Sequence, residues 1–258
     1  MMRTTDLLNI KGKTALVTGS SQGIGRSIAL ALAENGADIL LNYRSNRKLA
    51  EETRKEIMAC GVKCWLWEYD LLSDTITDEF LRLKKELGIS IDILVLNASI
   101  QIHREWNEVT HSDFSSQMNV NVRASLELIQ CCVPDMESKG WGRIVTVGSV
   151  QQYRPSRQMI VYAATKAAQR NMVKTLAWQL GGKGITINNL APGVIDTARN
   201  KAALADKSFK KDFESRIPLA TIGESRDLAA MALVLCSDAG RYITGDDILV
   251  DGGLNLPH

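Results

Sequence analysis

The chain has 258 residues, of which 45% are hydrophobic and 23% charged. This composition is typical of a globular protein with a sizeable core, and it excludes a disordered or low-complexity chain. Because 31 lysines and arginines nearly balance 29 aspartates and glutamates, charge gives no reason to expect nucleic acid as a partner. No run of 18 apolar residues and no apolar signal-peptide core is present, so we expect no membrane partner and no secretion.

The cysteines bear on the compartment and on metal binding. They are odd in number and form no CxxC pair: Cys60, Cys64, Cys131, Cys132 and Cys236. This pattern favours reduced thiols over disulfides or a metal site. We therefore expect a cytoplasmic protein without a bound metal.

Short aliphatic runs alternate along the chain with stretches of helical periodicity. The expected strands are residues 14–18, 38–43, 62–70 (the weakest), 91–97, 142–149, 184–192 and 246–253. Because these runs are apolar on both faces, they are typical of parallel strands covered by helices on both sides. The expected helices are residues 23–37, 46–59, 75–87, 111–138, 159–181 and 225–237.

This order predicts a doubly wound α/β (Rossmann) fold, in which a mostly parallel seven-stranded sheet carries helices on both faces. No linker or repeat divides the chain, so residues 1–258 form a single expected domain. The longest stretch without a clear strand runs from about 193 to 225 and contains a polar helical segment. Since it follows a strand's carboxyl end, we expect a mobile lid there, with a solvated helix as the alternative.

A glycine-rich turn, residues 18–25 with the sequence TGSSQGIG, joins the first strand directly to a helix. Glycine permits a sharp turn and a close approach to a pyrophosphate, and a helix N-terminus offers free N–H groups. The spacing is GxxxGxG and not GxGxxG, so a tight turn without a ligand is the alternative. Its place between a strand and a helix favours a dinucleotide site.

The end of the second strand indicates which dinucleotide binds. In such folds an acidic residue here binds the ribose hydroxyl of NAD, whereas an arginine accommodates the 2′-phosphate of NADP. The segment Leu41–Ser45 has no carboxylate but contains Arg44. NADP(H) is therefore favoured over NAD(H), unless Arg44 is merely a solvent-facing loop residue.

Tyr162 and Lys166 lie four residues apart in a predicted helix and so share one face. A neighbouring ammonium lowers the pKa of a phenol from about 10, which makes it a better acid and base at neutral pH. Ser149 ends a strand at the edge where these sheets bind ligands. Asn121 lies inside a helical stretch, where asparagine is a poor helix former, and it is therefore either functional or an exposed polar residue.

The chain resembles the short-chain dehydrogenase/reductase family from Lys13 to Gly253. The matching segments are TGSSQGIG at 18–25, Asp70, LNAS at 96–99, Asn121, Ser149, YAATK at 162–166, APGVIDT at 191–197 and VDGG at 250–253. The resemblance implies an NAD(P)-dependent oxidoreductase that interconverts a carbonyl and a secondary alcohol by hydride transfer.

The resemblance also implies roles for individual residues. Tyr162 would be the general acid/base, and Lys166 would lower its pKa and bind the nicotinamide ribose. Ser149 would hold the substrate oxygen, and Asn121 would position a water for proton relay. The implied cofactor-binding residues are Gly19, Ser21, Gly23, Ile24, Gly25, Arg44, Asp70, Leu71, Asn97, Ala98, Tyr162, Lys166, Pro192, Gly193, Ile195 and Thr197.

One residue departs from the family pattern. Ser99 stands where the family usually has glycine, so the local backbone must avoid a positive φ or be strained. We expect activity to survive, because the four implied catalytic residues are all present.

The substrate is less well indicated. The resemblance is nearest to 3-oxoacyl-[acyl-carrier-protein] reductases and glucose 1-dehydrogenases, which makes a 3-oxoacyl reductase the first expectation and a sugar, polyol or oxoacid dehydrogenase the alternative. For the first, an acyl-carrier protein would dock on Arg123, Arg154 and Arg157. For the second, the expected pocket rim is polar: Gln101, His103, Gln151, Gln152, Tyr153 and Arg154.

Two further alternatives concern turnover and assembly. A nucleotide-binding protein without turnover is disfavoured by the intact catalytic residues, and His103 and His111 are expected to be exposed loop residues. By the family resemblance, the helices at 111–138 and 159–181 would pair across subunits in a homotetramer. Cys131, Cys132, Met172 and Trp178 are apolar enough for that interface or for the monomer core.

Overall fold

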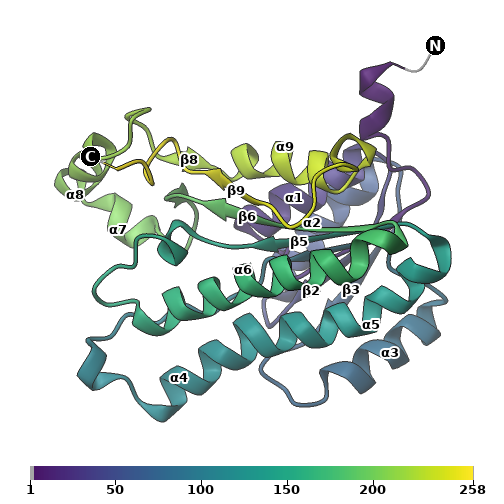
Figure 1. Ribbon diagram of the computed structural model, residues 1–258, viewed down its shortest axis with the longest axis horizontal. Helices are drawn as coiled ribbons and strands as arrows, with labels where there is room; N and C mark the ends of the chain where they lie inside the picture. The colour runs from purple at the N-terminus through teal and green to yellow at the C-terminus, as the bar shows by residue number, and fades with distance from the viewer. Residues whose placement is uncertain (1–2, 258) are drawn as a thin grey trace.

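Seven parallel strands form the centre of the computed structural model, which describes residues 3–257 (Figure 1). Their spatial order is β3-β2-β1-β4-β5-β6-β9. They are β1 (Thr14–Val17), β2 (Asp38–Tyr43), β3 (Cys64–Glu68), β4 (Ile93–Leu96), β5 (Gly142–Val147), β6 (Ile185–Pro192) and β9 (Asp247–Val250). All seven predicted strands are confirmed.

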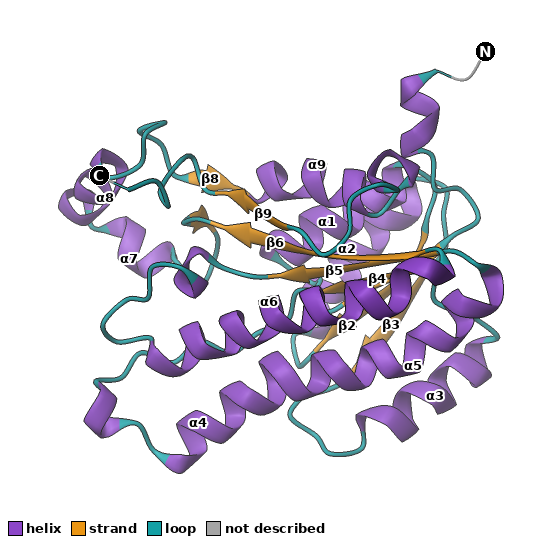
Figure 2. Cartoon of the chain, viewed as in Figure 1, coloured by secondary structure: helices purple, strands orange, loops and turns teal. Residues whose placement is uncertain are grey.

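Helices cover both faces of the sheet, as predicted (Figure 2). One face carries α1 (Gly23–Glu34), α2 (Arg47–Ala59) and α9 (Ser225–Leu235). The other carries α3 (Ile76–Leu87), α4 (His111–Met118), α5 (Ala124–Lys139) and α6 (Ile160–Leu180). Ala15 and Val17 pack into the core on the first face and Leu16 into the core on the second. Alternate side chains of a buried strand face opposite layers, which explains why the strand sequences are apolar throughout.

The strand order reverses between β1 and β4, and this reversal positions the site. From β1 the chain moves outward to β2 and β3 and then returns to place β4 on the other side of β1, with Val17 opposite Val95. In open α/β sheets ligands bind in the crevice at such a switch point, outside the carboxyl ends of the strands.

The helix predicted over 111–138 is interrupted. Between α4 and α5 lies a π-helical turn, Asn119–Arg123, in which Asn121 is fully buried. The alternative interpretation of Asn121 as an exposed polar residue is therefore wrong. Single π-helical turns inside longer helices are frequent at functional sites.

The segment 193–225 contains two short helices, α7 (Lys201–Ala205) and α8 (Lys207–Ser215). A parallel pair of two-residue strands, β7 (Ile195–Asp196) and β8 (Gly223–Glu224), brings its ends together. The predicted polar helix is confirmed, and the pair of short strands was not expected.

Cys131 and Cys132 are buried in the monomer core, whereas Trp178 is 92% exposed on α6. The cysteines are free thiols. None of the helices within residues 3–257 is both long and apolar enough to cross a membrane.

Candidate active site

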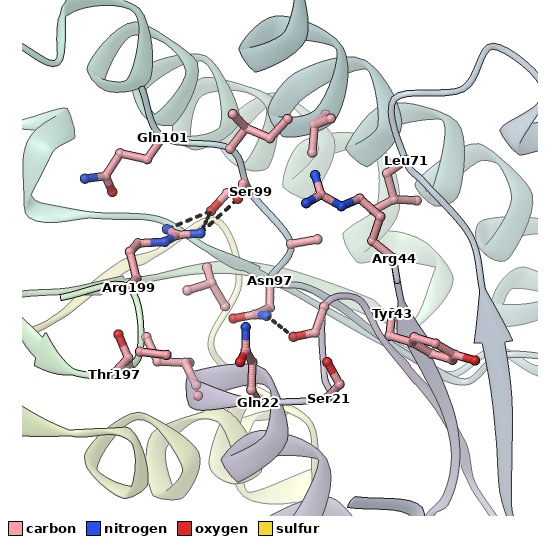
Figure 3. A pocket seen from close by; sticks show the side chains of 18 of the residues that line it. Ser21, Gln22, Tyr43, Arg44, Leu71, Asn97, Ser99, Gln101, Thr197 and Arg199 are labelled. Atoms are coloured by element: carbon pink, nitrogen blue, oxygen red, sulfur yellow. Dashed lines mark hydrogen bonds between the residues drawn. The ribbon is translucent and has the colours of Figure 1, made fainter. Parts of the chain in front are cut away.

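A cleft of about 410 Å³ opens at the carboxyl ends of the strands (Figure 3). Ser149, Tyr162 and Lys166 line it, as do all the predicted cofactor-binding residues except Gly25. Residues that lie far apart in the sequence, from the glycine turn to the segment after β6, are thus brought together in one cleft.

The glycine turn (residues 18–25) forms one wall of the cleft. Gly19 and Gly23 have φ values of +62° and +57°, a conformation that L side chains rarely adopt. The α1 helix begins at Gly23, and Gln22 at its N-cap position makes no side-chain capping hydrogen bond. The N–H groups of the first turn are therefore available to an anion such as a phosphate.

Gly25 is not among the residues that line the cleft, and its predicted contact with the cofactor stays a prediction. A Cβ atom at this position would lie 2.5 Å from Asn97 Nδ2 and 2.6 Å from the Gly19 carbonyl oxygen. The absence of a side chain therefore lets α1 pack closely against the end of β4.

Thr18 and Asn97 connect the ends of β1 and β4. The Asn97 and Ala98 N–H groups donate to Thr18 Oγ1 at 2.9 and 3.0 Å. Asn97 Nδ2 donates to the carbonyl oxygens of Thr18 and Gly19 at 2.9 and 3.1 Å. Asn97 was predicted to contact the cofactor, and it lines the cleft, but its side-chain amide also holds the glycine turn in place.

Asn42 is a positioning residue that the sequence analysis missed. Its Oδ1 accepts a hydrogen bond from the Gly19 N–H at 3.2 Å, and its Nδ2 donates to the carbonyl oxygens of Trp67 and Tyr69 at 3.2 and 3.3 Å. The available signal was an amide side chain inside the otherwise apolar strand DILLNY.

Arg44 and Leu71 lie near each other on one side of the cleft (Figure 3), and Asp70 also lines it. Arg44 forms no ion pair with any acidic side chain of residues 3–257. An arginine without an ion-pair partner, in the same cleft as free helix N–H groups, fits a second phosphate.

Tyr162, Ser149 and Lys166 also line the cleft, and Tyr162 and Lys166 lie within the electrostatic influence of Arg199. Lys166 is fully buried, and its Nζ donates to the Val147 carbonyl oxygen at 2.7 Å and to Gln169 Oε1 at 2.8 Å. Nζ lies 5.6 Å from the centre of the Tyr162 ring. Burial, together with the positive charge of Arg199, lowers the pKa of Lys166 to about 7.

The pKa of Tyr162 is raised, because burial penalises the phenolate. The charge of Arg199 opposes this effect most strongly, followed by the hydroxyls of Ser149 and Ser99. Arg199 is thus a second cation at the phenol, while the predicted effect of Lys166 on the same pKa stays a prediction.

Asn121 does not line the cleft but holds the loop that does. Its Oδ1 accepts the Ile100 N–H at 2.8 Å. Its Nδ2 donates to the Ile100 carbonyl oxygen at 2.9 Å and to Thr165 Oγ1 at 3.0 Å. Asn121 therefore links the backbone of the loop after β4 to α6, the helix that carries Tyr162. Its predicted role in a water relay stays a prediction.

Ser99 and Arg199 meet across the mouth of the cleft (Figure 3). Arg199 Nη1 donates to Ser99 Oγ at 3.1 Å, and Nη2 donates to the Ser99 carbonyl oxygen at 2.8 Å and to Oγ at 3.1 Å. Ser99 avoids the positive φ that would strain it, since Ala220 is the only non-glycine residue of 3–257 with positive φ. Arg199 was missed because an arginine in a polar helical segment looks solvated in the sequence.

Several residues predicted at the pocket rim point elsewhere. Gln152 Nε2 donates to the Asp247 carboxylate at 2.8 and 2.9 Å, and the Tyr153 hydroxyl also donates to Asp247. Arg154 donates to the Leu254 carbonyl oxygen. These three side chains tie the segment after β5 to β9 and the C-terminal segment, so only Gln101 of the predicted rim lines the cleft.

His103 and His111 are exposed, as expected. His103 contacts the Gln101 side-chain amide at 2.9 Å, and His111 contacts Ser115 Oγ at 3.2 Å. Neither histidine is among the residues that line the cleft.

Comparison with known proteins identifies the family. The family model described as enoyl-(acyl carrier protein) reductase matches residues 19–255. Gluconate 5-dehydrogenase of Gluconobacter oxydans (strain 621H) is 33% identical over 252 residues, covering 97% of this chain and 98% of that protein. The 3-oxoacyl-[acyl-carrier-protein] reductase of Staphylococcus epidermidis is 34% identical over 245 residues, covering 95% and 99%.

The fold agrees with this assignment. The crystal structure of 3-oxoacyl (acyl-carrier-protein) reductase from Agrobacterium tumefaciens C58 with NADP bound has a TM-score of 0.92 to this chain. It is 34% identical, with 97% of each chain covered. With the glycine turn, Tyr162, Lys166 and Ser149 in one cleft, the chain belongs to the short-chain dehydrogenase/reductase family of oxidoreductases.

Proposed function

We propose that the protein is an NADP(H)-dependent enzyme that interconverts a carbonyl and a secondary alcohol on a small polar substrate. The observation that carries this proposal is the placement of Ser149 and the buried Tyr162 in the same cleft as the glycine turn. When bound, NADPH would supply the hydride for the carbonyl carbon.

The cleft fits this cofactor. The uncapped first turn of α1 and the glycines at 19 and 23 suit a pyrophosphate. Arg44 at the far end suits the 2′-phosphate, and it stands where an NAD-binding chain would carry a carboxylate. The Agrobacterium relative was crystallised with NADP, which supports the same preference.

In the reducing direction the Tyr162 hydroxyl donates its proton to the carbonyl oxygen, and in the oxidising direction the phenolate accepts it from the alcohol. Ser149 Oγ donates a hydrogen bond to the same oxygen. Lys166, with its pKa lowered to about 7, exchanges a proton near neutral pH and so supports return of the phenol to its starting state.

The relatives support two substrate classes. The Staphylococcus protein is a 3-oxoacyl-[acyl-carrier-protein] reductase and the Gluconobacter protein acts on gluconate. Two of the three arginines expected to dock an acyl-carrier protein already have acidic partners, which weakens the support for a 3-oxoacyl-[acyl-carrier-protein] reductase. Arg123 is paired with Asp74 and Glu127, and Arg157 with Glu105.

We further propose a homotetramer in the cytoplasm, with the segment 193–225 as a lid over the cleft. Trp178 and Ile160 of α6 and Leu126 of α5 are exposed apolar side chains, and they support an interface formed by these two helices. Free thiols fit a reducing compartment. The molar mass measured by light scattering tests the assembly.

The reaction is tested by following NADPH absorbance at 340 nm with acetoacetyl thioesters, diketones, aldoses, sugar lactones and oxoacids. We expect turnover that Tyr162→Phe abolishes without loss of NADPH binding, measured by cofactor fluorescence. Tyr242→Phe, which alters an exposed tyrosine outside the cleft, is the matched control. Equal turnover in the wild type and Tyr162→Phe would reject this mechanism, and cofactor binding with no turnover on any substrate would favour a nucleotide-binding protein.

The cofactor preference is tested separately. Arg44→Ala should raise the KM for NADPH and leave that for NADH nearly unchanged, because only NADPH carries the 2′-phosphate. Arg47→Ala is the matched control, since Arg47 pairs with Glu51 and does not line the cleft. An equal effect of Arg44→Ala on both cofactors would exclude the phosphate contact.

A further inference from the structure

The substrate end of the cleft carries a positive charge that no acidic residue balances. Arg199 forms no ion pair with any acidic side chain of residues 3–257, and Asp70 is the only acidic residue among the described residues that line the cleft. Figure 3 shows Arg44 and Arg199 on opposite sides of the cleft with Asn97 between them. The two arginines thus face different parts of the cleft.

The polar partner of Arg199 is held firmly. Ser99 directly precedes Ile100, whose N–H and carbonyl oxygen are both bonded to the buried Asn121. Ser99 Oγ accepts from two guanidinium nitrogens of Arg199 at 3.1 Å. The hydroxyl and the guanidinium thus form a preorganised donor set, and a guanidinium binds a carboxylate with two parallel hydrogen bonds.

The location of this donor set limits the distance between the carboxylate and the reacting carbon. Arg199 and Ser99 line the same cleft as Tyr162. Both lower the pKa of its phenol, to which the substrate oxygen must bond. A carboxylate held by Arg199 would therefore stand only one or two carbons from the carbonyl. A thioester or an aldose offers no negative charge at this place.

We propose that Arg199 and Ser99 form a carboxylate-binding subsite, so that the substrate is a 2-oxo or 3-oxo acid or the corresponding hydroxy acid. The inference rests on the proposed function, because it takes Tyr162 as the group that faces the reacting oxygen. It favours the oxoacid class over thioesters and neutral sugars, and it assigns Arg199 as a specificity-determining residue.

The test compares each acid with its methyl ester, which keeps the ketone and removes the charge. The substrates are acetoacetate and 2-oxobutyrate with their methyl esters, assayed with NADPH. We expect the wild type to favour at least one acid in kcat/KM. Arg199→Ala should reduce the acid-to-ester ratio for that acid by roughly 10- to 100-fold, because a charge-assisted pair is lost.

Two variants control this experiment. Arg199→Lys retains the charge but not the planar fork, so it should recover part of the ratio. Arg216→Ala removes an arginine of the same segment that pairs with Asp212 and does not line the cleft, and it should leave the ratio unchanged. A ratio that Arg199→Ala does not change, or a wild type that prefers both esters, would overturn the subsite. A raised KM for NADPH at a constant ratio would assign Arg199 to the cofactor.

A binding measurement separates failure of the subsite from failure of the proposed reaction. Ligand-observed NMR with 3-hydroxybutyrate and its methyl ester needs neither turnover nor cofactor. Binding of the acid that Arg199→Ala abolishes supports the subsite even if no substrate is turned over. Ketone reduction without any such acid binding supports the reaction and rejects the subsite.

Discussion

Asn121 is hydrogen-bonded to both backbone groups of Ile100, although the two residues belong to different elements. The Ile100 N–H donates to Asn121 Oδ1 at 2.8 Å, and Asn121 Nδ2 donates to the Ile100 carbonyl oxygen at 2.9 Å. The π-helical turn between α4 and α5 places the Asn121 amide beside the loop that follows β4. The Asn121 side chain thus supplies the two hydrogen bonds that a neighbouring strand would give to the Ile100 backbone.

Replacing Asn121 should cost stability. In Asn121→Ala the partly buried N–H and carbonyl groups of Ile100 lose their partners, and each unsatisfied group costs about 1–3 kcal/mol. We expect the free energy of unfolding in urea to fall by at least about 2 kcal/mol. Asn119→Ala in the same turn, whose side chain makes no hydrogen bond within residues 3–257, is the control. Similar stabilities of the two variants would disprove this role.

The buried Lys166 should make stability depend on pH. Its pKa is lowered from 10.5 in the unfolded chain to about 7 in the folded one, so between these values the unfolded state binds more protons. Stability from this group therefore rises with pH from about 7 to 10.5 and is at its lowest, and constant, below about pH 7.

Lys166→Met isolates this contribution. The free energy of unfolding of the variant minus that of the wild type should be largest below pH 7 and should decrease as pH rises toward 10.5. Urea titrations of both proteins between about pH 6 and 9, in the absence of cofactor, measure this difference in the free energy of unfolding. Lys174→Met on the exposed side of α6 corrects for the general loss of one positive charge. A difference that increases with pH would contradict the shift.

Gly25→Ala should disturb the glycine turn through packing and not through φ. The added Cβ would press on Asn97 Nδ2 and the Gly19 carbonyl oxygen, and overpacking of this kind costs about 1–3 kcal/mol. We expect a lower midpoint in urea and weaker NADPH binding by fluorescence titration. Gly182→Ala, where a Cβ meets no atom within 4 Å, should change neither. Wild-type binding and stability in Gly25→Ala would refute the close packing.

The fold was largely predictable because its signals are local. Continuous apolar strands such as ILVL at β4 and helices with a regular apolar stripe each specify their own structure. The break at Asn119–Arg123 was not predictable, because a single π-helical turn covers too few residues to leave a distinct apolar pattern of its own. The β7–β8 pair was missed because two-residue strands carry no periodic signal.

The site was predictable where residues and spacing carry the chemistry, as with Tyr162, Lys166 and the glycine turn. It was not predictable where a contact joins distant parts of the chain. Arg199 and Ser99 are 100 residues apart, and neither position indicates the other. Conversely, Gln152 and Tyr153 looked like rim residues, yet Asp247 offers them a buried acceptor from a strand nearly a hundred residues away.

The Thr18 hydroxyl has a thermodynamic consequence for ligand binding. Because it accepts the Asn97 and Ala98 N–H groups and donates to the Val95 carbonyl oxygen, the floor of the cleft is ordered before any ligand arrives. Little conformational entropy is then lost when a dinucleotide binds against that floor.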